Sequence, residues 1–445
     1  MQSYRHLIVA ATLVAAWGCG ASNQGTGGSG GAGGPTVFMG YHASTLNLGA
    51  TDNSEIIKVQ PGTNTAFLVG SKTRKISRLT ITGDTVAETT SAVLFANDAT
   101  ESELTHLALG PDALWAVVTR TLIQRDGAGA AIGCAGEAVF VDLAAATFGT
   151  VLAQVAVGPM PDAVALTPDA AYAVVANERD VVWGKCEGVV GLDPASVSII
   201  SLAGGPAAAV EARRIIMSDA AHGEREPESV AIAADGDVVA VTLQDSHELA
   251  LFRLSDILNI VDPTAADTAI LLLPANSTGA MPWPDGVAAV QDGAGASLFV
   301  IAGEAADTVI VVDGSDATAP TLVGQRELTP SDVPAAFPRD GSWGPLFQPD
   351  SVTSFSYQGA RFVAVTLKAA GAVSVLRVDD GGGLVASAII KVGNTNELDS
   401  GTASVVAPEG VAARDGGLVG DEAFLVTANE GESSVSLIRP ERPIH

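Results

Sequence analysis

The sequence predicts an all-β protein, a seven-bladed β-propeller of four-stranded antiparallel blades. Two observations predict it: one unit recurs seven times, and the units contain short β-branched runs separated by Gly, Asp and Pro turns. The clearest copy is PDAVALTPDAAYAVVANE, from Pro161 to Glu178. Such runs are typical of strands, and self-similar units of four strands are typical of propeller blades.

The seven copies align on one apolar residue of the first run. The aligned residues are Ile57, Leu107, Val164, Val230, Val287, Val352 and Val411, at steps of 50, 57, 66, 57, 65 and 59 residues. Apolar residues form 47% of the chain and charged residues 16%, which argues for a large packed interior and against disorder. We therefore expect residues 36–445 to form one propeller domain.

The two ends of this domain predict how the ring closes. The last unit stops at SVSLIRPERPIH with only three runs, and TVFMGY (Thr36–Tyr41) is a lone run before the first unit. An exposed strand edge invites aggregation, and propellers must protect it. We expect the N-terminal strand to pair with the last blade as its fourth strand.

The first 35 residues predict export and anchoring. The basic start, the apolar run Leu7–Ala16 and Cys19 resemble a bacterial lipoprotein signal over residues 1–19, although Trp17 departs from the small residue usual there. An ordinary secretory signal is the alternative. Residues 20–35 form a Gly/Ser-rich tether, and Gly20 after the cysteine resembles outer-membrane sorting. We expect an outer-membrane lipoprotein of the cell envelope that touches the membrane only through its anchor.

The repeats also carry a family resemblance. The pattern P-[DE]-x-V-[AT] … V-[AT]-[NL] resembles YVTN-type and lactonase-like seven-bladed propellers. The last unit, APEGVAA … FLVTANEGESSVSLI, is similar to repeats of surface-anchored bacterial propellers of the choice-of-anchor type. The resemblance covers nearly all of residues 36–445 and implies the fold. It implies no single function, because such propellers host enzymes, electron-transfer partners and binding modules.

Acids recur at two positions of the unit. The start of the first strand and the end of the second lie at the same edge of a meander, and the innermost strand borders the channel, so the first acids should surround its mouth. These first acids, the acidic ring, are Glu55, Asp162, Glu228, Asp285, Asp350 and Glu409, with Thr105 in the second unit. The second acidic set is Glu178, Asp245 and Glu430, with Glu304 one residue out of register.

The ring requires some relief of repulsion, because carboxylates about 8 Å apart repel by about 2 kcal/mol per pair at an effective dielectric near 20. Bound calcium is one form of relief, since Ca²⁺ takes oxygen ligands from many carboxylates; the ring residues are then its candidate ligands. A structural role is the alternative, with each acid capping backbone N–H groups of its turn or of the next blade. A catalytic carboxylate is the third interpretation.

Cysteine usage predicts one disulfide. With Cys19 lipidated, Cys134 and Cys186 remain in an oxidising compartment. Both are expected between the second and third strands of consecutive units, where equivalent loops are neighbours. We predict a Cys134–Cys186 disulfide on the acidic face, with two reduced cysteines as the alternative.

One cluster could support catalysis. His222 in DAAHGEREPES shares its loop with Arg225 and Glu228. A His or Glu could activate water and the Arg could stabilise an oxyanion, as in lactone or ester hydrolysis. A solvated loop histidine is the alternative. The sequence contains no G-x-S-x-G, H-E-x-x-H, P-loop or C-x-x-C-H motif.

Charge sets the expected partners. The net charge of −27 disfavours nucleic acid and anionic membranes and favours cations or basic partners. The sequence therefore predicts a monomeric, lipid-anchored binding module whose acidic face takes Ca²⁺, a basic protein or peptide, or a polysaccharide bridged by Ca²⁺. The alternative is a lactonase-like or esterase-like hydrolase with its site at the central channel.

Overall fold

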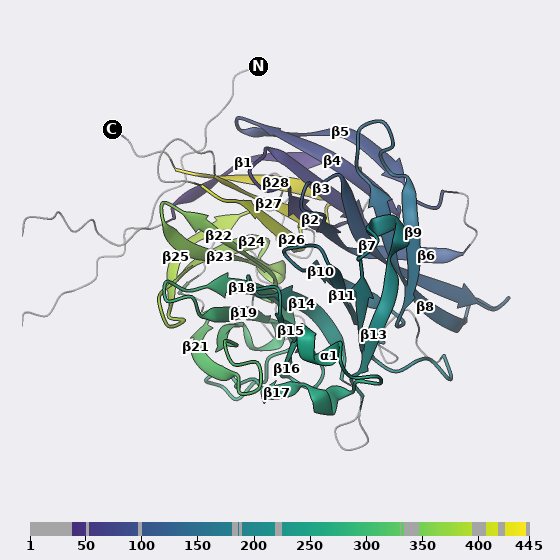
Figure 1. The fold of residues 1–445 in the computed structure, drawn as a ribbon. Coiled ribbons are helices and arrows are strands. Elements are labelled where there is room, and N and C mark those ends of the chain that lie inside the picture. The colour runs from purple at the N-terminus through teal and green to yellow at the C-terminus, as the bar shows by residue number, and fades with distance from the viewer. Residues whose placement is uncertain are drawn as a thin grey trace, which may run out of the picture. The chain divides into compact units, whose positions relative to one another are not determined.

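The computed structural model describes residues 38–49, 53–96, 100–179, 186, 189–218, 225–329, 331–332, 347–393, 406–416 and 423–441. It confirms the seven-bladed β-propeller: the described strands form seven antiparallel sheets of four strands each (Figure 1). The signal peptide and tether expected over residues 1–35 lie outside the described residues.

The blades follow one another along the chain, and within each blade the strands are ordered from the channel outward. Blade 1 contains β2 (Ser54–Val59), β3 (Thr65–Gly70), β4 (Lys75–Thr82) and β5 (Thr85–Val93). Blade 2 contains β6 (Glu101–Leu109), β7 (Trp115–Arg125), β8 (Ala131–Asp142) and β9 (Val151–Val157). Blade 3 contains β10 (Pro161–Leu166), β11 (Tyr172–Asn177), β12 (Ser196–Ser201) and β13 (Val210–Ile216).

The remaining blades repeat this order. Blade 4 contains β14 (Pro227–Ile232), β15 (Val238–Leu243), β16 (Glu248–Arg253) and β17 (Ala269–Leu272). Blade 5 contains β18 (Pro284–Gln291), β19 (Ser297–Gly303), β20 (Thr308–Asp313) and β21 (Thr321–Glu327). Blade 6 contains β22 (Pro349–Tyr357), β23 (Ala360–Leu367), β24 (Ala372–Val378) and β25 (Leu384–Lys391). Blade 7 contains β26 (Pro408–Arg414), β27 (Phe424–Asn429), β28 (Ser434–Pro440) and β1 (Gly40–Asn47).

The ring closes through the N-terminal strand, as predicted. Strand β1 pairs antiparallel with β28, from Gly40 opposite Pro440 to Asn47 opposite Ser434, and the purple and yellow ends of the chain lie side by side (Figure 1). The strand bounds differ from the expected Thr36–Tyr41. Phe38 precedes the strand, and its buried ring packs against Phe355 and Phe362 of blade 6.

The interior consists of apolar layers between neighbouring blades. Seven large clusters of buried residues correspond to the seven blade interfaces. Middle strands such as β15, VVAVTL, are buried at every residue because both faces of a blade pack on neighbours, so they do not alternate apolar and polar residues. The innermost strands contact one another around a closed circuit from β2 through β26 and back.

Helical structure is minor in the described part of the chain. It is limited to α1 (Leu254–Ile257) and the 3₁₀ turns η1 (Pro206–Ala208), η2 (Ala265–Asp267), η3 (Glu304–Ala306) and η5 (Lys368–Ala370). None of these described helices has the length and apolar character to cross a membrane.

Candidate functional site

The acidic ring lies at the start of the innermost strands. Each of its six residues is the second residue of its strand: Glu55 in β2, Asp162 in β10, Glu228 in β14, Asp285 in β18, Asp350 in β22 and Glu409 in β26. In blade 2, Thr105 occupies this position and donates a hydrogen bond to the carbonyl of Pro161 in blade 3. The threonine therefore joins two blades where the others carry a charge.

A repeated backbone turn presents these acids. The residue before the strand has a left-handed backbone at Asn53 (φ 43°), Met160 (φ 49°), Gln348 (φ 52°) and Ala407 (φ 35°). Its carbonyl accepts the N–H of the residue that follows the second strand, as Met160 O does from Glu178 at 2.9 Å. A non-glycine residue in this region costs energy, so the fold accepts local strain to fix the two acidic positions together.

The ring carboxylates form one electrostatic cluster. Burial raises the pKa of Asp162 to about 7, with a further contribution from the charge of Glu409. The pKa values of Glu55, Glu228, Asp285 and Asp350 are raised well above their usual range, first by burial and then by neighbouring carboxylates, most of them from other blades. Sequence analysis placed these acids at one mouth, and the structure brings them within range of one another's charge.

A lysine that sequence analysis missed lies inside this cluster. The Nζ of Lys368 in η5 is 3.5 Å from Asp350 Oδ2 and forms a second ion pair with Glu409 Oε1. Although burial acts to lower it, the pKa of Lys368 is raised well above its usual value by Glu409 and Asp350. Its charge also acts on Asp162, Asp285 and Glu304, so one ammonium compensates part of the ring.

The strand register explains why Lys368 lies beside the ring, and it changes which residues belong to the second acidic set. The residue directly after the second strand is Ser71, Glu178, Gln244, Glu304, Lys368 or Glu430 in six blades, as equivalent backbone hydrogen bonds show. Glu304 is therefore in register, whereas Asp245 is not: β15 ends at Leu243 opposite Pro227, so Gln244 takes the position and Asp245 lies exposed one residue further. Lys368 occupies in blade 6 the position that is acidic in blades 3, 5 and 7.

The three in-register acids of the second set join the ring. The charge of Glu178 and that of Glu304 raise the pKa of Glu228, and Glu430 acts on Glu55 and Glu409. Glu430 Oε1 also accepts a hydrogen bond of 2.7 Å from the side-chain amide of Asn53. Both acidic positions of the repeat therefore contribute to one negative mouth.

The hydrogen bonds of the ring acids test whether each acid caps backbone N–H groups of its turn or of the next blade. Glu55 receives a side-chain hydrogen bond from Ser71, and Asp350 and Glu409 pair with Lys368. Within the described residues no backbone N–H group donates to any of the six ring carboxylates. The Oε2 atom of Glu228 is buried and has no hydrogen-bond partner in this part of the chain. Among the described residues, loop capping therefore does not account for the ring.

The mouth is open to solvent. Five of the ring acids are half-buried rather than enclosed, and a third of the Lys368 side chain is exposed. No three His, Cys, Asp or Glu side chains among the described residues converge closely enough to hold one metal ion. The predicted calcium site stays a prediction.

The candidate catalytic cluster is only partly described. His222 lies outside the described residues. Arg225 is almost fully buried, and its Nε donates to Glu248 Oε2 of β16 at 2.6 Å. Because Arg225 is held by the third strand of its blade and Glu228 belongs to the acidic ring, the described residues bring no catalytic pair together. The hydrolase hypothesis stays a prediction.

The structure contains the Cys134–Cys186 disulfide, with a Cα–Cα distance of 5.9 Å. Cys134 lies within β8, not in the loop before it, because β7 and β8 form a long hairpin that extends beyond the blade. Cys186 follows β11 in blade 3 and is buried with Ile123 and Met160. The bond ties blade 2 to blade 3 on the side where the second strands end, which is the acidic side.

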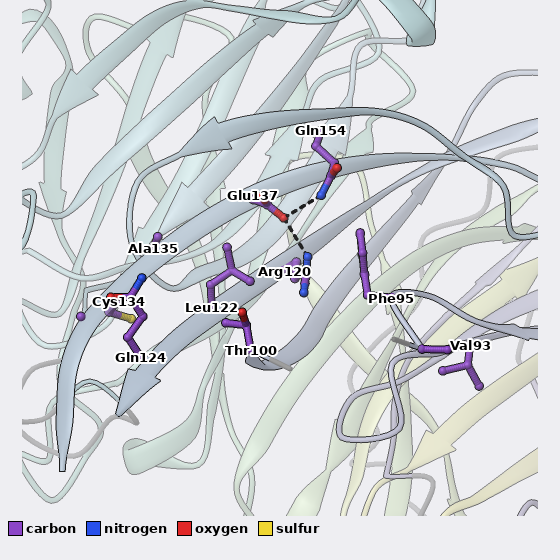
Figure 2. A pocket seen from close by; sticks show the side chains of 12 residues that line it. Val93, Phe95, Thr100, Arg120, Leu122, Gln124, Cys134, Ala135, Glu137 and Gln154 are labelled. Carbon is purple, nitrogen blue, oxygen red and sulfur yellow. Dashed lines mark hydrogen bonds and ion pairs between the residues drawn. The ribbon is translucent and has the colours of Figure 1, made fainter. Parts of the chain in front are cut away.

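A large cavity lies outside the channel. It measures about 910 Å³ and lies against β7 and β8 of blade 2. Figure 2 shows Glu137 between Arg120 and Gln154, with Glu137 Oε2 accepting hydrogen bonds from both at 3.1 and 3.2 Å. The Arg120 guanidinium also lies 3.7 Å from the ring centroid of Phe95. The charged groups that line the cavity are thus already paired with each other, and its size alone does not make it the functional site.

Comparison with known proteins supports this architecture. Residues 55–260 match the family model of the choice-of-anchor I domain. The match covers the first three blades and most of the fourth. It indicates an exported, cell-surface protein whose propeller is a binding or interaction module. The resemblance to choice-of-anchor propellers is thereby confirmed, whereas the YVTN-type and lactonase-like labels are not.

Solved structures agree on the fold alone. Hydrazine synthase of Kuenenia stuttgartiensis is 12% identical over 88% of this chain and 96% of its own, with a TM-score of 0.53. The Cps50 (Swd1) β-propeller domain of Myceliophteria thermophila is 7% identical over 90% of this chain and 100% of its own, with a TM-score of 0.54. No curated protein sequence matches the chain significantly.

Proposed function

We propose that the propeller is the binding domain of a lipid-anchored surface protein and that its acidic ring receives a cationic group of a partner protein. The observation that carries this proposal is Lys368, whose ammonium lies between the carboxylates of Asp350 and Glu409. The ring thus already accommodates one basic side chain of the protein itself. The arc of blades 3 and 4, which includes Asp162 and Glu228, has carboxylates for a second one, and Glu228 Oε2 has no hydrogen-bond partner among the described residues.

A basic side chain suits this arrangement better than a bare metal ion. Calcium needs six to eight oxygen ligands at 2.3–2.6 Å, and no such group forms among the described side chains. An ammonium or guanidinium group can bind two carboxylates from a wider ring through several N–H donors. The competing ligand is calcium, alone or bridging a polysaccharide, and the experiment must distinguish it from a basic side chain.

Binding should be coupled to proton release. Raised pKa values mean that part of the ring is protonated near neutral pH, as for Asp162 with a pKa of about 7. A bound cation favours the ionised carboxylates, so protons leave as the ligand binds. Affinity should therefore increase from pH 5 to pH 8.

The lipid anchor is part of this proposal. Cys19 would carry the lipid, and residues 20–35 would hold the propeller away from the outer membrane. Replacing Cys19 by Ala should release the protein from the membrane fraction and abolish incorporation of labelled palmitate. Retention of both in Cys19→Ala would contradict anchoring at this residue.

The test of the ring uses the full chain with tetralysine peptide as the probe. Calorimetry at pH 7 in two buffers of different ionisation enthalpy measures affinity and proton release together. We expect Glu228→Gln combined with Asp285→Asn to weaken binding at least tenfold and to reduce proton release. The matched control is Asp256→Asn combined with Asp262→Asn, which removes two exposed acids outside the ring and should change neither.

Two outcomes would overturn the proposal. Equal affinity in the double variant and the control would mean that tetralysine responds only to the net charge of −27. A saturable increase of melting temperature with Ca²⁺, reversed by chelator and absent in the double variant, together with no specific binding of tetralysine, would make calcium the ligand.

A further inference from the structure

The channel contains a second cavity, and the only ionisable side chains that line it are basic. It measures about 340 Å³ and is lined by residues of the innermost strands of six blades. Pro61 and Pro111, in the turns after β2 and β6, also line it. Because these turns follow the ends of the innermost strands, the cavity in blades 1 and 2 reaches the face opposite the acidic ring, whereas its lining residues Ser229, Gly286 and Ser351 in blades 4 to 6 directly follow ring acids.

Two ionisable side chains line this cavity, Lys58 of β2 and His106 of β6. The residues equivalent to Lys58 in the other blades are small: Ala108, Ala165, Ala231, Ala288, Thr353 and Ala412. Of these, Ala108 and Ala165 line the cavity together with Lys58. The rest of the lining is Val, Leu, Ala, Gly and Pro apart from Ser229 and Ser351.

In the part of the chain that the structure describes, Lys58 has no partner of opposite charge. Among the described residues its ammonium forms neither an ion pair nor a hydrogen bond, and no carboxylate lines the cavity. Glu55 lies three residues earlier on the same strand, roughly 10 Å along it toward the acidic mouth. Burial lowers the pKa of Lys58 to about 8, so the group still carries its proton at neutral pH.

His106 contributes a second hydrogen-bond donor. Its Nδ1 accepts the backbone N–H of Val164 at 3.3 Å, so on the neutral ring the proton resides on Nε2. Burial, and then the charge of Lys58, keep the pKa of His106 well below its usual value. The cavity therefore presents two N–H donor groups from adjacent blades and lacks an ionised acceptor for them.

We propose that this cavity binds a small monocarboxylate, with its carboxylate between Lys58 and His106 and its apolar part against the valine and alanine lining. A carboxylate has two acceptor oxygens for two donors. Its single negative charge matches the single ammonium, whereas a dianion would bring an uncompensated charge into a poorly solvated space. The volume is that of a small-molecule site, and entry is from the face away from the acidic ring.

The test uses benzoate as the probe, with benzamide as its uncharged isostere and inorganic phosphate, a mixture of monoanion and dianion at pH 7, as an anion without an apolar part. Ligand-observed NMR on the full chain at pH 7 and 150 mM NaCl, which screens the overall negative charge, measures each affinity. We expect benzoate to bind at least tenfold more tightly than benzamide or phosphate. Lys58→Met should abolish this preference, while Lys72→Met, at an exposed lysine, should leave it unchanged.

A second measurement on the native sequence keeps the proposal falsifiable if Lys58→Met folds poorly. Cyanate carbamylates neutral amines, and peptide mass spectrometry reports the rate at Lys58 and Lys72 in the same sample. Benzoate should slow modification of Lys58 at least fivefold and leave Lys72 unaffected. Equal binding of benzoate and benzamide, preference for phosphate, or no protection of Lys58 would each overturn the proposal.

Discussion

The two ends of the channel differ in how their charges arise. The acidic ring is built by recurrence, since six blades place an acid at the same strand position and the ring symmetry concentrates them. The far cavity is built by exception, since Lys58 replaces the small residue that the other blades carry. Because the blades stack around one axis, one acid in each unit adds up to a strong negative electrostatic field at one end of the channel. At the other end, a single lysine in one blade determines the charge.

The two ends also differ in compensation. Lys368 neutralises part of the acidic mouth, whereas Lys58 has no counter-charge among the described residues. A buried pair broken by removal of one partner is destabilising, while removal of an isolated buried charge relieves a cost. Lysine-to-methionine substitutions at the two ends should therefore have opposite signs.

The largest effect is expected for Lys368→Met. Removing this ammonium leaves Asp350 and Glu409 facing each other without a cation, so the free energy of unfolding should fall by about 3–5 kcal/mol at pH 8. Chemical denaturation at pH 8 and pH 5 measures it, and the loss should shrink at pH 5 as the carboxyls become protonated. The control is Lys72→Met; an equal loss at both pH values would contradict a shared charge cluster.

The disulfide should have the next largest effect. It closes a loop with a sequence separation of 52 residues, and a loop of this size corresponds to about 2–4 kcal/mol. Cys134→Ala combined with Cys186→Ala should lower stability by this amount without changing its pH dependence, because the bond carries no charge. An altered pH dependence would show that the staple also positions the acidic ring.

The acidic ring should make the native protein more stable at mildly acidic pH. Where the folded pKa of a carboxyl lies above its unfolded value, the folded state binds more protons, so stability falls as pH rises through that window. For Asp162 the window extends from 3.8 to about 7, and the expected loss between pH 5 and pH 8 is on the order of 2 kcal/mol. Denaturation curves should show a flatter dependence for Glu228→Gln with Asp285→Asn.

The smallest effect, and the opposite one, is expected for Lys58→Met. The pKa of Lys58 is lowered from 10.5 to about 8, so the unfolded chain binds more protons between these values and native stability rises with pH there. The substitution should increase stability by about 1–2 kcal/mol at pH 7, with the gain shrinking by pH 10. A loss of stability at pH 7 would mean that Lys58 has a partner in solution.

The sequence predicts the scaffold well because each blade repeats the same local chemistry. The proline, acid and β-branched residues from Pro161 onward predict strand, turn and register together, and the position of Asp162 follows from the meander. Lys368 could not be found from a search for acids, although an alignment of the residue after each second strand would have found it. The β14–β15 pairing, which decides between Gln244 and Asp245, depends on a bulge that the residue pattern does not reveal.

Lys58 shows a second limit. The position of Lys58 in β2 follows from the repeat. The free energy that burial of its ammonium costs depends on the residues that the other innermost strands place around it. The small residues at Ala165 and its equivalents are typical of tight packing, so the sequence does not distinguish a filled channel from a cavity. That difference is a property of the closed ring.

The central claim is that carboxylates from different blades form one coupled cluster. Carbon-13 NMR of selectively labelled aspartate side chains, titrated from pH 3 to pH 9 and assigned with Asp162→Asn, tests it most directly. We expect the Asp162 carboxyl to titrate near pH 7 and to move when Glu409 is replaced by Gln. Titration of Asp162 near pH 4, unchanged by that substitution, would contradict the account.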